Sequence, residues 1–247
     1  GGGGGRICMN CHTSRVNGDT YADTTAGSSR FGPHYGPQTD MLMGKNAYEY
    51  GRFIPSSAHK TAVKDSCVTC HMQTLDPNDP AKNHAGEHTF KIKWDAGTPG
   101  DHGDDVPVLG SCQECHGDID SFDFARQDYD MNGVIEGVQT EVKGLLDRLG
   151  RLLPPLDSPT VTITAAYTVQ QRRAAFNYLF VLEDASYGVH NTAYTVNLLK
   201  ASLADLTGDF GIVGDIDNDG LPDEWEIQYF GGTSAQDANG DADGDGL

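Results

Sequence analysis

Three short motifs contain all six cysteines of this 247-residue chain. Each reads Cys-x-x-Cys-His, and in this spacing two thiols can form thioether bonds to one porphyrin while the next residue places an imidazole beside the iron. The motifs therefore predict three covalently attached haem c groups. Their predicted attachment residues are Cys8, Cys11 and His12; Cys67, Cys70 and His71; and Cys112, Cys115 and His116.

Two other uses of paired cysteines remain open. Three disulfides would be ordinary in a secreted chain, but a disulfide framework does not require a histidine after every pair. Zinc could take four thiolates from two pairs, although three pairs are an awkward number for such sites. The repeated histidine therefore favours haem over disulfides and zinc.

Six further histidines bear on whether the irons transfer electrons or bind a substrate. An iron with two protein ligands tends to pass electrons, whereas an iron with an open face can bind a small molecule. We read His84 and His102 as solvated, with His102 kept as an alternative ligand. The second axial ligands are expected among four residues that lie near the motifs, in a turn-rich loop or before a helix: His34, His59, His88 and His190. Since only three are needed, one could serve a haem outside this chain.

Several of these segments resemble a known family. The runs SAHKTAVKDSCVTCHM, GEHTF, SCQECHG and YGVHNTAY, within about residues 56 to 206, resemble the C-terminal haem segment of multihaem cytochromes related to pentahaem nitrite reductases and octahaem hydroxylamine-oxidising enzymes. The resemblance implies distal-ligand roles for His59, His88 and His190. The run HYGPQTDMLMG is similar to loops of multihaem cytochromes in which the histidine binds haem, which implies the same role for His34. Those nitrite reductases use a CxxCK motif, which this sequence lacks.

Composition and charge limit the class of protein. Residues 1 to 130 are rich in Gly, Pro, Asp, Asn and Ser, so we expect cofactors rather than side-chain packing to organise them. The net charge of -19 argues against a nucleic-acid partner, because phosphate binding relies on clustered Lys and Arg. No apolar run could span a bilayer, and no signal peptide is present at the start. Both ends look cut, so we expect the ordered part of a longer periplasmic or extracellular protein.

Apolar periodicity predicts three helices in the second half of the chain. One begins at Val134 and stops before Pro154, the second runs from about Tyr167 to Glu183, and the third begins near Asn191. Arg172 and Arg173 are read as solvated helix charges, with haem propionates as the alternative partners. The expected stripes are Val134, Val138, Val142, Leu145, Leu149 and Leu152; Ala175, Leu179 and Leu182; and Val196, Leu199, Leu203 and Leu206.

The acidic segment DIDNDGLPDEWE matches a calcium loop position by position, with Gly220 at its turn. A solvated acidic linker is the alternative. A second copy begins at Asp241, and such repeats resemble thrombospondin type 3 or EF-like modules of secreted bacterial proteins. The predicted calcium ligands are Asp215, Asp217, Asp219, Leu221, Asp223 and Glu226.

Together these patterns predict a mainly α fold with extensive loop, organised around three covalent haems. We expect a loop-rich trihaem region at 1–130, a helical region at 131–208 packing on the haems, and a truncated calcium repeat at 209–247. The expected function is electron transfer through closely spaced bis-histidine haems, with redox proteins or copies of the same chain as partners. A haem enzyme acting on a small nitrogen or sulfur compound, and a haem filament, remain alternatives, and no catalytic residue is assigned.

Overall fold

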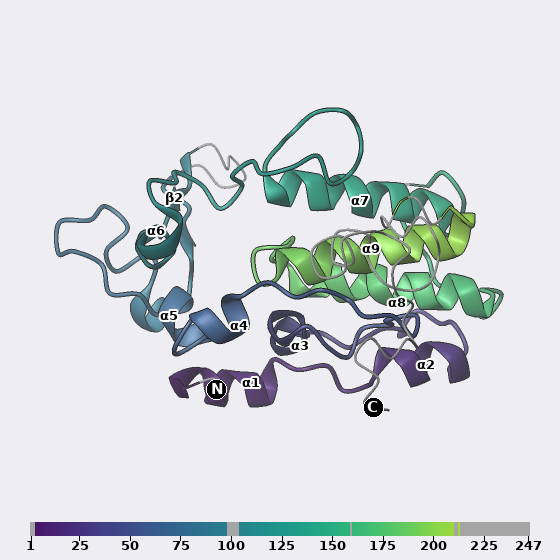
Figure 1. Ribbon diagram of the computed structural model, residues 1–247. Helices are drawn as coiled ribbons and strands as arrows, with labels where there is room; N and C mark the ends of the chain where they lie inside the picture. The colour runs from purple at the N-terminus through teal and green to yellow at the C-terminus, as the bar shows by residue number, and fades with distance from the viewer. Residues whose placement is uncertain (1–2, 98–103, 159, 210–211, 213–247) are drawn as a thin grey trace, which may run out of the picture.

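A computed structural model of the chain describes residues 3–97, 104–158, 160–209 and 212. The described part is mainly helical with long loops, as predicted. Three long helices, α7 (Val138–Leu152), α8 (Val169–Asp184) and α9 (Thr192–Thr207), form one end of the molecule (Figure 1). The short helices that carry the cysteines gather at the other end. The predicted calcium loop at 215–226, the second acidic repeat and His102 lie outside the described residues.

Local signals explain the boundaries of the long helices. The side chain of Thr168 accepts a hydrogen bond from Gln171 N, and the Gln171 side chain accepts one from Thr168 N, a capping box that starts α8. Asn191 caps α9 through a single bond, with its side chain accepting from Tyr194 N. Helix α7 ends at Leu152, before two prolines that cannot continue a helix.

The first predicted helix begins four residues too early. Helix α7 starts at Val138, and Val134 is 57% exposed in the loop before it. Leu152, the last residue of the predicted apolar stripe, is also partly exposed. In α8 the predicted stripe is wrong at Leu182, which is exposed, because the helix turns Phe176 and Phe180 inward instead. The predicted α9 stripe is largely confirmed, since Val196, Leu199 and Leu203 are buried.

The hydrophobic core draws residues from both halves of the chain. Helices α2 (Gly18–Thr24) and α3 (Gln38–Met43) pack on α8, and Phe31, Met41 and Tyr48 join its buried cluster. The buried side chain of Asn177 in α8 accepts a hydrogen bond from Tyr48 N and donates one to Tyr48 O. This bidentate contact ties the first half of the chain to the helical bundle.

The arginines of α8 also join the two halves. The Arg173 guanidinium forms an ion pair with Asp23, at 2.6 Å from Nε to Oδ1, and lies over the Tyr48 ring. Arg172 donates to the backbone carbonyls of Ala22 and Asp23. Both side chains therefore join α8 to α2, and the expectation that they are solvated helix charges is wrong for them.

The cysteine-bearing end has little core of its own. It contains η1 (Gly3–Gly5), α1 (Arg6–Cys11), α4 (His59–Ala62), α5 (Cys67–His71), η2 (Glu87–Thr89) and α6 (Gly110–His116). Strands β1 (Lys93–Trp94) and β2 (Val106–Pro107) pair antiparallel beside a small cluster around Leu75. Helices α1, α5 and α6 bury no residue. Among the described residues, no helix is long and apolar enough to cross a membrane.

Candidate functional site

Each Cys-x-x-Cys-His motif folds as one short helix. One turn of helix brings the two cysteines of a motif toward the same side and leaves the histidine at the helix end. All six cysteines are free thiols, and each is half-buried or exposed. The thiols are therefore accessible to a prosthetic group at this end of the molecule.

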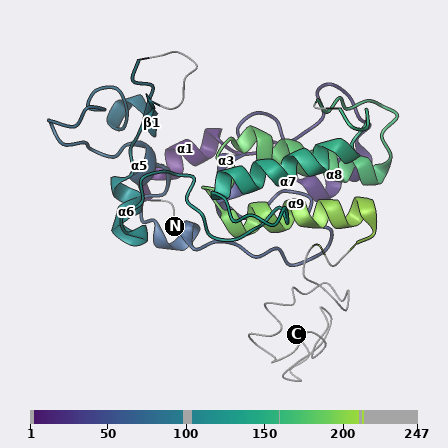
Figure 2. The ribbon, with the colours of Figure 1, turned by 90° about the horizontal axis from the view of Figure 1, so that it is seen from above.

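The three motifs lie in the order α1, α5, α6. Helix α5 contacts η1, which leads directly into α1, and also contacts α6. Burial and the neighbouring Cys8 thiol raise the pKa of Cys67. Burial, followed by the charge of Cys112, raises the pKa of Cys70 to about 11. The second motif therefore has one thiol beside the first motif and one beside the third, and both views of the ribbon show the three helices together (Figures 1 and 2).

At this end of the molecule, four histidine rings form two pairs, and the two rings of each pair face each other. The ring centres of His59 and His116 lie 6.0 Å apart with perpendicular planes. Those of His71 and His190 lie 6.2 Å apart with planes inclined by 45°. In each pair, one ring comes from a Cys-x-x-Cys-His motif and the other is a predicted distal ligand.

This spacing fits two imidazoles that share one metal ion. Two metal–nitrogen bonds of about 2 Å, plus about 1.2 Å from each nitrogen to its ring centre, separate the ring centres by about 6.4 Å. Aromatic rings in direct contact elsewhere in the described residues have centres from 4.3 Å apart, in the stacked His84–Trp94 pair, to 6.4 Å apart, in the edge-on Phe31–Phe176 pair. The His59–His116 and His71–His190 separations lie within this contact range and are also compatible with two imidazoles that share one metal ion.

The second nitrogen of several rings is already engaged. His71 Nδ1 lies 2.9 Å from the carbonyl oxygen of Phe90, and His59 Nδ1 lies 3.3 Å from that of His190. His12 Nδ1 lies 3.1 Å from Gln38 Oε1. Metal-bound histidines usually donate their other ring N–H in this way, which fixes the ring and leaves Nε2 for the metal.

The protonation of the motif histidines suits a metal ligand as well. Burial lowers the pKa of His71; the hydrogen bond to the Phe90 carbonyl partly offsets this, and the His190 and His12 rings lower the pKa further. Burial and then His59 lower the pKa of His116. Because a metal binds the neutral imidazole, a low pKa keeps these rings in the competent form at neutral pH.

His190 has a different partner from the other rings. Its Nδ1 lies 2.7 Å from Oδ1 of Asp184, the last residue of α8. The Asp184 side chain is fully buried. Burial lowers the pKa of His190, but the charge and hydrogen bond of Asp184 more than offset this effect, so the pKa lies above its ordinary value. Of the histidine rings in the described residues, His190 alone has a carboxylate within ion-pair distance.

The remaining predicted ligands are not brought together. No other histidine ring of the described residues pairs with the His12 ring. His34 is exposed, with a φ of 70° and its Nδ1 near the carbonyl of Tyr35, and His88 is exposed in η2. His84, read as solvated, is also exposed, although its ring stacks on Trp94. The predicted ligand set therefore divides into two paired distal histidines and two exposed ones.

Large apolar side chains are exposed around the motifs. Ile7, next to Cys8 in the sequence, is 81% exposed, and Tyr35, next to His34, is 76% exposed. Phe90, whose backbone carbonyl contacts His71, is 53% exposed. Burial of exposed apolar side chains against another apolar surface is favourable. Together with motif helices that bury no residue, these side chains fit contact with a flat apolar macrocycle.

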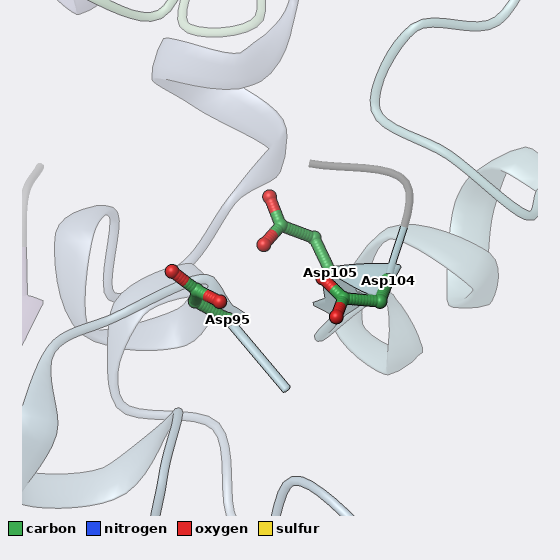
Figure 3. A group of neighbouring side chains, drawn as sticks. All are labelled: Asp95, Asp104 and Asp105. Atoms are coloured by element: carbon green, nitrogen blue, oxygen red, sulfur yellow. The ribbon is translucent and has the colours of Figure 1, made fainter. Parts of the chain in front are cut away.

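Two acidic groups of the described residues could hold a metal ion. In one, Asp95 faces Asp104 and Asp105 from the neighbouring segment (Figure 3). Lys93 forms an ion pair with Asp105, so a cation already balances part of this charge.

The other group comprises Asp128, Asp130 and Glu141, and sequence reasoning missed it. Asp130 and Glu141 are buried, and Glu141 accepts hydrogen bonds from the backbone N–H groups of Tyr129, Asp130 and Glu136. The run DYDMNG at 128–133 has the spacing of the segment DIDNDG at 215–220, with Asn132 in place of the third aspartate, and this was the available signal. Glu141 escaped notice because it lies two positions beyond the usual last ligand of such a loop.

Comparisons with protein-family models, curated proteins and solved structures found no match for this chain.

Proposed function

We propose that this chain is an electron-transfer cytochrome that binds three haem c groups through its Cys-x-x-Cys-His motifs. The observation that carries the proposal is the pair of histidine couples, His71–His190 and His59–His116, each with the ring separation of two axial ligands. An iron held by two imidazoles has no open face for a substrate, and its low-spin state changes oxidation number with little rearrangement. The haem groups would supply the redox chemistry, while the chain fixes the ligands and spaces the centres.

The adjacency of the motifs supports a relay. Cys8 neighbours Cys67, and Cys70 neighbours Cys112, so groups attached to these thiols would lie in sequence along α1, α5 and α6. The acidic surface suits a soluble protein or a basic redox partner outside the cytoplasm. We propose in addition that the loop at 215–226 binds calcium and stiffens the connection to whatever follows it.

The unpaired His12 favours a second candidate function. An iron bound by His12 alone would offer an open face, where a small nitrogen or sulfur compound could bind and be oxidised or reduced. A third use of the same position is a ligand from a second copy of the chain, since His34 and His88 are exposed. That arrangement would produce a haem filament.

The test begins with purified protein from a host that attaches haem c. An intact mass increased by three haems and a haemochrome spectrum of three haem c groups are expected, and the mass of the bare polypeptide would end the proposal. Ferric spectra should show low-spin signals for at least two haems. Replacing His59 or His190 by Ala should convert one haem to high spin, while His84→Ala, a matched exposed histidine, should change no spin state.

The alternatives are separated by the same sample. A high-spin component in the unsubstituted protein that shifts on adding nitrite or hydroxylamine favours the enzyme. A spectrum that becomes fully low-spin as the protein assembles into larger species favours ligation between copies.

A further inference from the structure

The hydrogen-bond partners of the histidine rings differ in charge. The Nδ1 atoms of His59 and His71 face backbone carbonyls, and that of His12 faces the neutral amide of Gln38. Of these four rings, only that of His190 faces a carboxylate, at 2.7 Å. The hydrogen bonds therefore divide the four rings into three with neutral partners and one with an anionic partner.

Asp184 lies in an unfavourable place for an anion. It is 2% exposed, and it is the last residue of α8, where the carbonyl groups of the helix end already produce a negative potential. The other partners of its carboxylate are the N–H and the hydroxyl of Ser186. A buried charge needs compensation, and residues that violate a local rule in this way are often functional.

A positive centre on the far side of the His190 ring would provide that compensation. Asp184 contacts Nδ1 of the His190 ring, and the His71 ring lies 6.2 Å from its centre, so a metal ion shared by the two imidazoles would bind the other ring nitrogen, Nε2. A carboxylate that accepts a hydrogen bond from Nδ1–H makes the imidazole a stronger electron donor to its metal. Stronger donation and a nearby negative charge both stabilise the ferric over the ferrous state.

We infer that Asp184, acting through His190, makes the haem attached to Cys67 and Cys70 the lowest-potential centre of the three. This inference rests on the proposed function. In the redox step one electron enters a ferric iron from the redox partner and gives the ferrous iron, and no bond forms or breaks. Because the second motif lies between the other two, the most reducing haem occupies the middle of the relay. Electrons therefore reside on the two outer haems of the relay, and transfer through the middle haem requires an uphill step in free energy.

Asp184→Asn is the direct test, since the amide keeps the shape and can still accept the Nδ1–H hydrogen bond without the charge. Spectroelectrochemical titration of the holoprotein should resolve three one-electron components. In the variant, the ratio of oxidised to reduced haem at a fixed potential should fall about tenfold for one component, which corresponds to a midpoint about 59 mV higher. The other two components should change by less than about twofold.

A matched control removes the neighbouring charge. Glu183→Gln eliminates one negative charge a single residue away, with no bond to His190, and should leave all three components within about twofold of the original ratios. If both variants shift the same component equally, the hydrogen bond has no special role and the inference is overturned. It is also overturned if Asp184→Asn moves no component, or moves a component other than the one that becomes high-spin in His190→Ala.

A second variant keeps the test available if Asp184→Asn does not fold. Ser186→Ala removes the hydroxyl that donates to Asp184, which leaves the carboxylate a stronger acceptor for His190. The same component should then shift in the opposite direction, to lower potential, and no shift would contradict the inference. Loss of the three covalent haems would refute the proposed function, whereas three low-spin haems with unmoved potentials would refute this inference alone.

Discussion

Asn191 offers the sharpest test of how the fold positions the histidine pairs. This residue follows His190 directly and is fully buried. Its side chain accepts hydrogen bonds from Ser57 N at 2.7 Å and Tyr194 N at 3.2 Å, and donates to Ser56 Oγ and Met41 O. It therefore joins α9 to α3 and to the segment that leads into His59.

The expected cost of Asn191→Ala follows from these bonds. Loss of the helix cap costs about 1 kcal/mol, and each further buried hydrogen bond lost costs about 1 kcal/mol net. The sum, about 2–4 kcal/mol, should lower the melting temperature by about 4–16 °C in a chain of this size. Because the residue also orients the two distal histidines, part of the ferric low-spin signal should convert to high spin.

The matched control is Asn197→Ala, in the same helix. Asn197 is half-buried, and its side chain donates only to the carbonyl of Ala193. Its replacement should cost less than about 1 kcal/mol and leave the spin state unchanged. Thermal and denaturant unfolding followed by circular dichroism, with absorbance in the haem region, measure both effects. Equal destabilisation by the two variants, or Asn191→Ala with an unchanged midpoint, would refute the reasoning.

Three further predictions concern charge, calcium and the exposed histidines. Arg173 lowers the pKa of Asp23 below its usual 3.8, so the ion pair stabilises the fold above that pH and its contribution is lost as pH falls through the lowered value. Asp23→Asn should therefore weaken the loss of stability at acid pH, measured as the free energy of unfolding against pH. An unchanged loss of stability would contradict the assignment. Equilibrium dialysis should find calcium bound to the chain, and Asp217→Asn combined with Glu226→Gln should remove at least one ion per chain; unchanged stoichiometry would leave the loop at 215–226 without a role. A second copy of the chain could supply the missing ligand of the iron bound by His12. In that case, replacing both His34 and His88 by Ala should dissociate the assemblies seen by size-exclusion chromatography and add a high-spin component. Assemblies that persist unchanged would exclude these two histidines as the linking ligands.

The sequence predicts the long helices well because their apolar residues recur at the helical period. The apolar period predicts a start four residues too early for the first one, because Val134 continues the period. The chain there is instead drawn into a loop whose N–H groups at Tyr129, Asp130 and Glu136 bind the Glu141 carboxylate. Hydrophobic periodicity contains no information about such a polar contact, so it cannot locate this boundary.

The cysteine motifs were identifiable from spacing alone, because the chemistry of attachment acts within five residues. Pairing of the distal histidines depends on contacts across long sequence separations, such as the one between His59 and the backbone of His190, 131 residues away. No local pattern specifies which ring meets which. The sequence therefore indicated the candidates, and the fold selects His59 and His190 as the members that face motif histidines.

His190 lies at the junction of the two histidine pairs. Its ring faces His71, while its own backbone carbonyl receives the Nδ1 hydrogen bond of His59, which faces His116. One peptide group therefore connects the environments of two prospective metal centres. A tilt of the His190 ring that rotates its backbone will turn the His59 ring as well, so the two centres cannot be adjusted independently by changes at this position.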